Sequence, residues 1–272
     1  MKIIQYFNTP INYNRLPLYP LSMGTNYTQG SINRQKGYHG FQWLQTLSGE
    51  GIFQCNGHQF DLPAGCGIFI DKSTSHHYYS SSDNEWLTAW LVFDGPYAER
   101  ILSFMELSFF TPYAITDLYL FTSTFEQLSG LSHKNTAKEF MEASTVLYNF
   151  LYQSGSALIH TDSPLFFKYK KIEPIIEYIN ANYSKDLSLE TLASLINISP
   201  QYFCSIFKSI TGLRVFEYIN RIRINHAKEL LLGTSYSVDQ IALMCGYDSS
   251  SYFFTLFKKH QGYTPGAFRK MK

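Results

Sequence analysis

Residues 199–212 read SPQYFCSIFKSITG, and residues 249–262 read SSSYFFTLFKKHQG. Six positions of the two stretches coincide at a constant offset of fifty residues: Ser199 and Ser249, Tyr202 and Tyr252, Phe203 and Phe253, Phe207 and Phe257, Lys208 and Lys258, and Gly212 and Gly262. Each stretch opens with a serine, a residue type that caps helix N-termini. The repeat therefore predicts two equivalent helices, each starting at its serine.

A shorter apolar segment precedes each copy, at residues 189–196 and 238–244. Ala193 and Ala242 occupy comparable places in these segments, where a small side chain lets the following helix cross closely. The turns between the helices contain Asn197 and Gly246, which tolerate a left-handed backbone. A short helix, a tight turn and a second helix form a helix-turn-helix, so we predict two in tandem.

The tandem arrangement suits DNA for a geometric reason. A recognition helix fits the major groove, where base edges present distinct donors and acceptors. Residues 216–232 form a predicted connecting helix, and two helices on one rod can enter groove segments about 34 Å apart. Residues 168–272 carry a net charge of +6 and the preceding residues −5, which favours a polyanionic partner for the C-terminal part. The alternative is a plain helical bundle with a duplicated hairpin.

The N-terminal part has a different pattern. Short strand-like segments separated by turn signals run from residue 3 to residue 95, including a predicted hairpin turn at Asn56 and Gly57. Between residues 98 and 153 the apolar spacing becomes helical, with two expected helices. The apolar stripe of the second is marked by Phe140, Val146 (or Leu147), Phe150 and Leu151. We therefore expect a barrel or sandwich at 1–97, a helical dimerisation region at 98–153, a linker at 154–168 and the helix-turn-helix domain at 169–272.

The C-terminal hundred residues closely resemble the DNA-binding domain of AraC/XylS-family transcription regulators. The resemblance rests on residues 187–190 (LSLE), 198–203 (ISPQYF), 246–247 (GY), 251–253 (SYF) and 262–265 (GYTP). It implies an α+β multidomain fold, with an N-terminal cupin-like β-barrel, a helical dimerisation region and an all-α tandem helix-turn-helix domain. It also implies double-stranded DNA as a partner, a homodimer, and RNA polymerase as a further candidate partner.

The recognition helices supply the candidate DNA contacts. We expect Tyr202, Phe203, Ile206 and Phe207 to face the core of the first unit, and Phe253, Leu256 and Phe257 that of the second. The remaining side chains correspond to contact positions in the resembling family: Gln201, Cys204, Ser205, Lys208, Ser250, Ser251, Phe254, Thr255 and Lys258.

Neither recognition helix contains arginine, although arginine to guanine is the commonest specific contact. We therefore expect Phe254 and Thr255 to contact thymine methyl groups and Gln201 to read adenine. Lys208, Lys258, Lys259 and Arg221 are expected to hold phosphates. The alternative for each residue is simple surface exposure.

The N-terminal half resembles the cupin-like arm of sugar-sensing family members. That resemblance assigns the ligand site to Arg34, His76, Tyr78 and Trp90. An indole ring can stack on the C–H face of a sugar, while the other three side chains supply donors and acceptors for its hydroxyls. The alternative is that the histidines lie on the surface and Trp90 in the core.

Several other classes of protein are disfavoured. No HxH pair occurs, and His76 and His77 are adjacent, so on a strand they point to opposite faces; we expect no metal and no cofactor. No phosphate loop, GxSxG or HExxH motif indicates an enzyme. Four scattered cysteines without a CxxC pair favour reduced thiols, and the sequence shows neither a signal peptide nor an apolar membrane span. We expect a cytoplasmic protein with no membrane partner.

The resulting hypothesis is a sequence-specific DNA-binding transcription regulator that responds to a small molecule. A sugar is the favoured effector, in control of genes for carbohydrate uptake or use, and activation and repression both stay open. One alternative is a fatty acid or other apolar effector, suggested by 22 Phe and 21 Tyr. Others are a cupin enzyme with an appended helical domain and a regulator whose barrel serves only for dimerisation.

Overall fold

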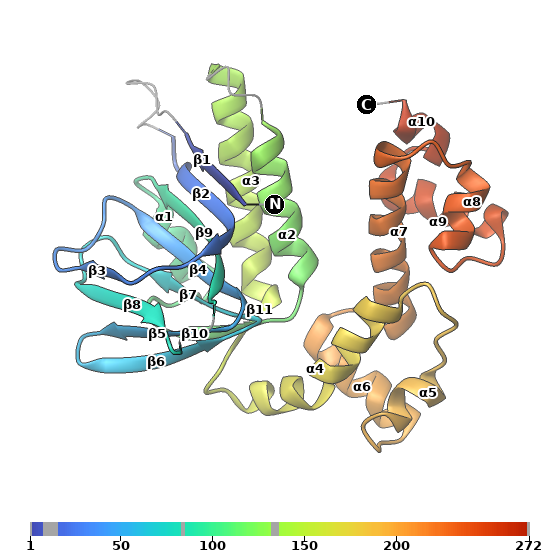
Figure 1. Cartoon of the computed structure of the whole chain (residues 1–272), viewed down its shortest axis with the longest axis horizontal. Helices are drawn as coiled ribbons and strands as arrows, with labels where there is room; N and C mark the ends of the chain where they lie inside the picture. Colours follow the sequence, from blue (N-terminus) through green and yellow to red (C-terminus); the bar gives the residue numbers. More distant parts are fainter. Residues whose placement is uncertain (1, 8–15, 83–84, 132–135, 271–272) are drawn as a thin grey trace. The chain divides into compact units, whose positions relative to one another are not determined.

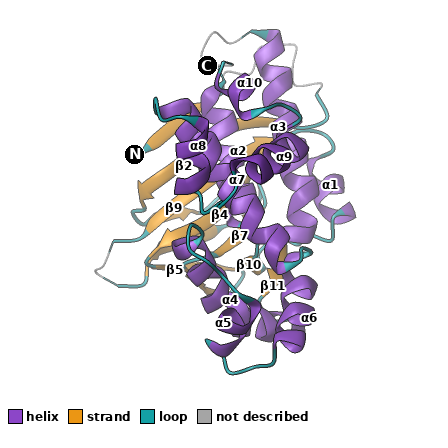
Figure 2. Cartoon of the chain, turned by 90° about the vertical axis from the view of Figure 1, so that its right-hand side faces the viewer, coloured by secondary structure: helices purple, strands orange, loops and turns teal. Residues whose placement is uncertain are grey.

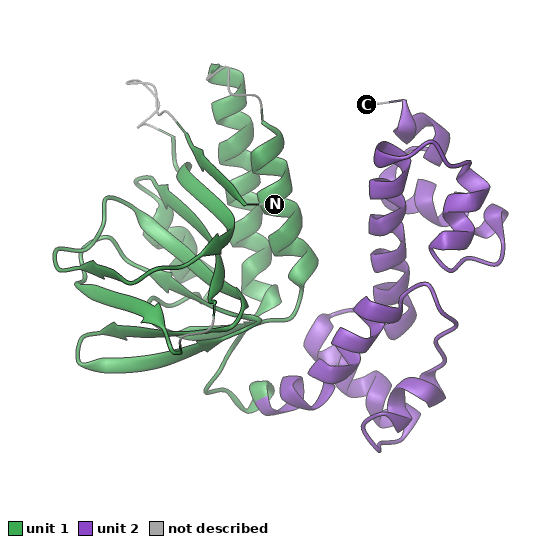
Figure 3. Cartoon of the chain, viewed as in Figure 1, with its two compact units in different colours: residues 1–166 green, residues 167–272 purple. Residues whose placement is uncertain are grey.

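The computed structural model describes residues 2–7, 16–82, 85–131 and 136–270. The chain divides into two compact units, residues 1–166 and 167–272 (Figure 3). Each unit is described separately below. The predicted fold class, a β-rich N-terminal domain and a helical C-terminal one, is confirmed, because every strand among the described residues lies in unit 1 (Figure 2).

Unit 1 contains two antiparallel sheets (Figure 1). The larger has the order β1-β2-β9-β4-β7-β10-β11 and the smaller β3-β8-β5-β6. The strands are β1 (Ile3–Tyr6), β2 (Tyr19–Thr28), β3 (Ile32–Arg34), β4 (Phe41–Ser48), β5 (Glu50–Cys55), β6 (His58–Pro63), β7 (Cys66–Ile70), β8 (His76–Ser80), β9 (Leu87–Asp94), β10 (Pro112–Ile115) and β11 (Leu158–His160).

The larger sheet is covered on both faces, which explains why the first six residues of β4, polar and apolar alike, are all buried. Trp43 contacts the helical layer, with its ring 5.3 Å from that of Phe121. The next residue, Leu44, points the other way and packs with Phe53 and Tyr78 of the smaller sheet. Successive strand residues point to opposite faces, so one strand contributes to two cores.

Helices α1 (Ala98–Phe104), α2 (Leu118–Gly130) and α3 (Ala137–Ala157) form the helical layer. The predicted apolar stripe of α3 is confirmed, since Phe140, Phe150 and Leu151 are buried. Of the two alternatives for its middle position, Leu147 is buried and Val146 is half-buried. Among the described residues of this region the structure has three helices where two were expected, and β10 interrupts them. Residues 154–160, which we expected in a linker, instead end α3 and form β11, the edge strand next to β10.

Unit 2 is helical. Its elements are α4 (Pro164–Asn182, which begins just before the unit boundary), α5 (Leu189–Ser194), α6 (Pro200–Thr211), α7 (Val215–Gly233), α8 (Val238–Met244), α9 (Ser250–Gln261) and α10 (Pro265–Arg269). The predicted serine caps are confirmed, because Ser199 accepts a hydrogen bond from the backbone N–H of Tyr202 and Ser249 from that of Tyr252.

The two helix-turn-helix turns are built alike. Asn197 and Gly246 both have positive φ angles, 55° and 81°. The residue after each donates its N–H to the alanine of the preceding helix, Ile198 to Ala193 and Tyr247 to Ala242. α5–α6 and α8–α9 are therefore two copies of one structural unit, joined by α7.

Candidate nucleic-acid interface and effector pocket

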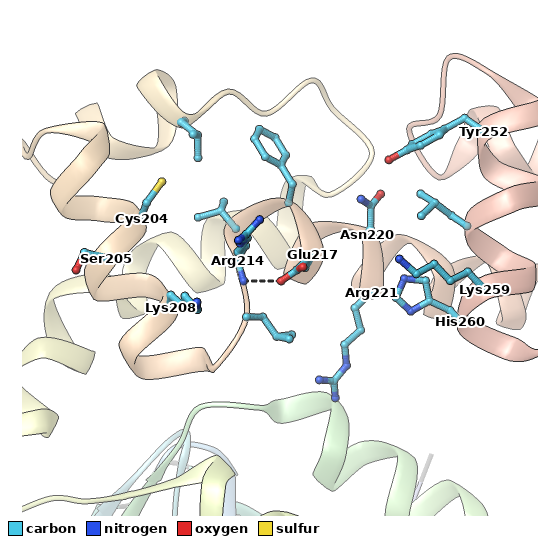
Figure 4. Close-up of a pocket in the computed structure, with 15 residues that line it drawn as sticks. Cys204, Ser205, Lys208, Arg214, Glu217, Asn220, Arg221, Tyr252, Lys259 and His260 are labelled. Carbon is cyan, nitrogen blue, oxygen red and sulfur yellow. Dashed lines mark hydrogen bonds between the residues drawn. The ribbon is translucent and has the colours of Figure 1, made fainter.

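A groove of about 990 Å³ lies between the two recognition helices of unit 2. α6 contributes Cys204, Ser205 and Lys208 on one side, and α9 contributes Tyr252, Lys259 and His260 on the other (Figure 4). Between them lies the start of α7, which contributes its N-cap residue Arg214 and, from its first two turns, Glu217, Asn220 and Arg221 (Figure 4). The groove therefore joins the two helix-turn-helix units into one surface.

This groove is basic. Lys208, Arg214, Arg221 and Lys259 all line it, and the carboxylate of Glu217 accepts a hydrogen bond from the Arg214 backbone N–H at 2.9 Å. Partial burial and the nearby charges of Lys259 and Arg221 lower the pKa of His260 below its ordinary value. A groove with this charge attracts a polyanion such as a phosphate backbone.

The structure places the predicted contact residues on the surface of α6 and α9. Two of them are half-buried, Cys204 and Ser250. The others are exposed, namely Gln201, Ser205, Lys208, Ser251, Phe254, Thr255 and Lys258. Thr255 donates its hydroxyl to the carbonyl of Ser251 at 3.1 Å, so its hydrogen is used within the helix. Its methyl group can still contact a thymine methyl.

One prediction for the core was wrong. Tyr202 is 47% exposed, and the Nζ atom of Lys171 lies 5.1 Å from the centre of its ring. Leu256 packs against the core of the second helix-turn-helix, as predicted, but it is only half-buried and also lines the groove. Phe203, Phe207, Phe253 and Phe257 are buried with no exposed surface, as predicted.

Sequence reasoning missed several groove residues. Arg214, Asn220 and His260 were not singled out, and Tyr252 was noted only as part of the repeat. Residues 252, 256, 259 and 260 fall on one side of α9 because the helix repeats every 3.6 residues. This helical periodicity, together with the basic residues Lys259 and His260 near the end of α9, could have indicated from the sequence that these side chains line the groove.

Unit 1 contains a cavity of about 150 Å³. Three of the four predicted ligand residues line it, namely Arg34, Tyr78 and Trp90. They come from different strands, β3, β8 and β9, and the register pairs Ile32 with Tyr78 and Gly24 with Trp90. The remaining lining residues are Ile4, Tyr6, Ser22, Tyr27, Gln29, Ile32, Tyr38 and Gln42.

Arg34 is the centre of the polar wall. Its Nη1 donates to Oε1 of Gln42 at 2.7 Å, and its guanidinium lies 3.4 Å from the centre of the Tyr38 ring. The Tyr78 ring is 5.9 Å away, and burial raises the pKa of that phenol. Tyr78 therefore stays protonated and can donate a hydrogen bond, next to a fixed cation.

Trp90 contributes an apolar surface to the cavity. Its ring meets the Tyr27 ring edge to face at 4.9 Å. Gly24 lies directly against it, and a β-carbon at that position would overlap the indole ring. A glycine is therefore required for Trp90 to occupy this place.

His76 is the fourth predicted residue, and it does not line this cavity. It is 2% exposed and its ring lies parallel to that of Tyr78, 6.0 Å away. Its Nδ1 is 2.8 Å from the carbonyl oxygen of Thr74, while its Nε2 is buried without a partner. Burial lowers the pKa of His76, so the ring is neutral near pH 7 and lies behind Tyr78. His77 points to the other face, as predicted, toward Ser31.

Tyr38, Gln42 and Gln29 of this cavity were missed by the sequence reasoning. Gln42 and Gln29 are polar side chains that are almost fully buried. The signal for Gln42 was its place in the apolar strand 41–47, since a buried amide needs polar partners. Tyr38 lies in a loop, where no periodicity of the sequence indicates which way a side chain points.

Among residues 2–7, 16–82, 85–131 and 136–270, no cluster of three or more His, Cys, Asp and Glu side chains is arranged to hold a metal ion. Over the same part of the chain, no helix combines the length and apolar character needed to cross a membrane.

Comparison with protein families gives two matches. Residues 25–151 match a family described as an AraC-like ligand binding domain, and residues 192–271 match one described as a helix-turn-helix domain. The first match includes Arg34, Tyr78 and Trp90 of the cavity, and the second contains both recognition helices.

Three relatives illustrate the range of similarity. The chain is 26% identical to the lactose operon transcription activator of Staphylococcus xylosus over 78% of this chain and 77% of that protein. It is also 26% identical to the Msm operon regulatory protein of Streptococcus mutans, over 82% of each. The bifunctional transcriptional activator/DNA repair enzyme AdaA of Bacillus subtilis is 40% identical over 100 residues, which is 37% of this chain and 47% of AdaA. This chain thus spans about half the length of AdaA.

Among solved structures, part of this chain is similar to the C-terminal domain of AraT, a response regulator from Geobacillus stearothermophilus. The two are 34% identical with a TM-score of 0.37, over 40% of this chain and 87% of that domain.

Proposed function

The chain belongs to the AraC family of DNA-binding transcription regulators, and we propose that α6 and α9 read one DNA duplex together. We also propose that the cavity lined by Arg34 binds a sugar. In this proposal the sugar controls how the recognition helices are presented to DNA. The target genes are those for carbohydrate uptake or use.

The DNA proposal rests on the shared groove. α6 and α9 lie on either side of the basic surface that contains Arg221 and Lys259. Each recognition helix enters one segment of the major groove, and the basic residues between them hold the intervening phosphates. Base contacts come from Gln201, Ser205, Ser251, Phe254 and Thr255.

Selection of duplexes from a random library by the full chain tests this proposal. We expect two adenine- and thymine-rich segments, because Phe254 and Thr255 favour thymine methyls and Gln201 favours adenine. Thr255→Val, which keeps a methyl, should retain the thymine preference that Thr255→Asn loses. Selected sites with guanine at the positions facing α6 and α9 would contradict the assignment.

The sugar proposal rests on one observation, the pairing of a polar wall around Arg34 with the apolar ring of Trp90 in one small cavity. Hydroxyl groups can bond to Arg34, Gln42 and Tyr78, while the C–H face of a ring stacks on Trp90. At about 150 Å³ the cavity is smaller than the roughly 300–1,000 Å³ of drug-sized sites, which favours a small ligand.

The names of relatives support the same class of effector. Two of them regulate the lactose and Msm operons, and a third, 33% identical over 100 residues, is the melibiose operon regulatory protein of Escherichia coli. An apolar effector is less well supported, because Arg34 faces the cavity and its hydrogen bond to Gln42 fixes it there.

A thermal-shift screen against monosaccharides, disaccharides and fatty acids tests the effector class. A ligand that binds only the folded chain stabilises it by about 2.7 kcal/mol at a hundredfold excess over its dissociation constant. We expect a shift with one sugar, lost in Arg34→Ala and Trp90→Ala and kept in Arg100→Ala, an arginine outside the cavity. A shift with acyl chains alone would contradict the proposal, and no shift with any compound would favour a barrel that serves only for dimerisation.

We further propose a cytoplasmic homodimer that acts without catalysis and contacts RNA polymerase when it activates transcription. Met141, Tyr148 and Tyr152 are exposed on α3 at a spacing of seven and four residues, which places them on one stripe of the helix. A second copy of this stripe would cover them. Tyr148→Glu combined with Tyr152→Glu is expected to yield a monomer by sedimentation, whereas a monomeric wild-type chain at micromolar concentration contradicts the dimer.

A further inference from the structure

Arg223, on α7, joins the segment after α4 to the rest of unit 2. Its Nε donates to the carbonyl oxygen of Tyr183 at 2.7 Å and its Nη2 donates to that of Lys185 at 2.9 Å. α4 ends at Asn182, so these carbonyls lie just beyond its C-terminus, where a cation is favourable. One guanidinium thus holds two carbonyls of a single turn.

The same segment also meets the second helix-turn-helix. The guanidinium of Arg223 lies 5.4 Å from the centre of the Tyr247 ring, in the turn between α8 and α9. Gly246, the left-handed residue of that turn, lies against Ser184, and a β-carbon at Gly246 would be 2.5 Å from the Ser184 carbonyl oxygen. Residues 183–185 are therefore packed against α7 and the second turn together.

An aromatic contact completes this arrangement. The rings of Tyr183 and His226 are stacked, 4.0 Å apart and 8° from parallel. His226 lies three residues after Arg223 and so on the same side of α7. The residues that fix the segment, Arg223, His226, Gly246 and Tyr247, are called the clamp below.

α4 itself is tied to the first helix-turn-helix. Its apolar face, including Ile172, Ile175 and Ile179, is fully buried. Lys171 of α4 also lies over the ring of Tyr202 on α6. Residues 183–185, which follow α4, thus extend the first helix-turn-helix (α5–α6) and reach the turn of the second (α8–α9).

We propose that Arg223 is a positioning residue that fixes the orientation of the two helix-turn-helix units, and so sets the number of base pairs between the two segments they read. These segments are called boxes. α7 alone connects the two units covalently, and the clamp adds a second connection beside it. The inference rests on the proposal that α6 and α9 read one duplex together.

The planar guanidinium is suited to this role. Its donors form a rigid fork that reaches two carbonyls at once, while its face lies near the ring of Tyr247. Lysine presents a single point of charge and cannot hold both carbonyls in the same geometry. Arg223→Lys is therefore expected to behave more like Arg223→Ala than like the wild type.

The experiment measures box spacing with the full chain. A duplex with two boxes is first selected by the wild type, and versions are then made with one or two base pairs added or removed between the boxes. For the wild type we expect affinity to fall at least tenfold for each altered spacing. For Arg223→Ala we expect less than a threefold difference among the spacings, with weaker binding to the original duplex.

Two further variants separate positioning from folding. Tyr183→Ala removes the stacked ring and should relax the spacing preference in the same direction, so the test does not depend on Arg223→Ala folding well. Arg221→Ala, an arginine two positions away in the groove, should weaken binding to all spacings by the same factor. A merely destabilised chain would likewise lose affinity uniformly, without a change in spacing preference.

The outcomes distinguish the clamp from the function on which it rests. A wild type that is strict for spacing, with Arg223→Ala and Tyr183→Ala equally strict, overturns the clamp and leaves two-box reading intact. If the wild type selects duplexes with only one box, the proposal that α6 and α9 read one duplex together is wrong, and the clamp proposal fails with it.

Discussion

At the scale of single residues, His260 links DNA binding to pH. Partial burial, Lys259 and Arg221 lower its pKa in the free protein, so the ring is largely neutral at pH 7. Phosphates in the groove would favour the protonated ring, so the pKa should rise in the complex. We predict that DNA affinity increases as pH falls from 8 to 6, measured by fluorescence anisotropy at constant salt. His260→Gln should flatten this dependence, and an unchanged slope in that variant would contradict the prediction.

His76 links the stability of the barrel to pH in a different way. Burial lowers its pKa, so the unfolded chain binds a proton more readily than the folded chain once the pH falls below about 6.5. This contribution to stability is present above that pH and is lost below it. We predict a steeper loss of melting temperature between pH 7 and 5 for the wild type than for His76→Phe, which keeps a ring beside Tyr78 without a titrating group. Parallel pH profiles would show that His76 does not carry the effect.

At the scale of elements, the serine caps stabilise the two recognition helices. Ser199 and Ser249 each satisfy a backbone N–H in the first turn of a recognition helix. We predict that Ser199→Ala and Ser249→Ala each lower the free energy of unfolding by about 1 kcal/mol, measured by urea denaturation. Ser209→Ala is the matched control, because Ser209 lies within α6 and bonds only to the carbonyl of Ile206. An equal loss in the control would remove the capping explanation.

At the scale of the whole molecule, the uneven charge distribution matters for the strength of DNA binding. The C-terminal part carries the excess of positive charge, and four of its cations, Lys208, Arg221, Lys258 and Lys259, are assigned to phosphates. Each phosphate contact contributes about −0.9 to the slope of log affinity against log salt, so we predict a slope of about −3 to −4 per chain. Lys259→Ala should reduce the slope by about one. Glu99→Gln, a charge change in the N-terminal unit, should leave it unaltered.

Much of the architecture followed from sequence patterns of short range. The repeat at residues 199 and 249, the two serine caps and the left-handed turns at Asn197 and Gly246 all depend on local backbone preferences, which are visible in a few consecutive residues. The apolar stripe of α3 is likewise periodic. Tyr202 was misassigned because an aromatic side chain next to a core position resembles a core residue in sequence, whereas its exposure depends on what α4 leaves uncovered.

Local patterns were therefore enough to predict a β-rich part, a helical part and the tandem helix-turn-helix, and the family resemblance pointed to three of the side chains that line the barrel cavity. Which side chains share a site depends on contacts between residues far apart in the chain, and these are set by the folded structure. Tyr78 and Trp90 come from different sheets and meet only because the two sheets pack together around one cavity, while a loop adds Tyr38 beside Arg34. His76, two residues before Tyr78 on β8, stacks on the Tyr78 ring instead of lining the cavity. The clamp around Arg223 joins residues that are 38 to 40 positions apart through backbone carbonyls. Every residue except the last carries such a carbonyl, so no sequence pattern marks the two that are used, and only the folded chain selects them.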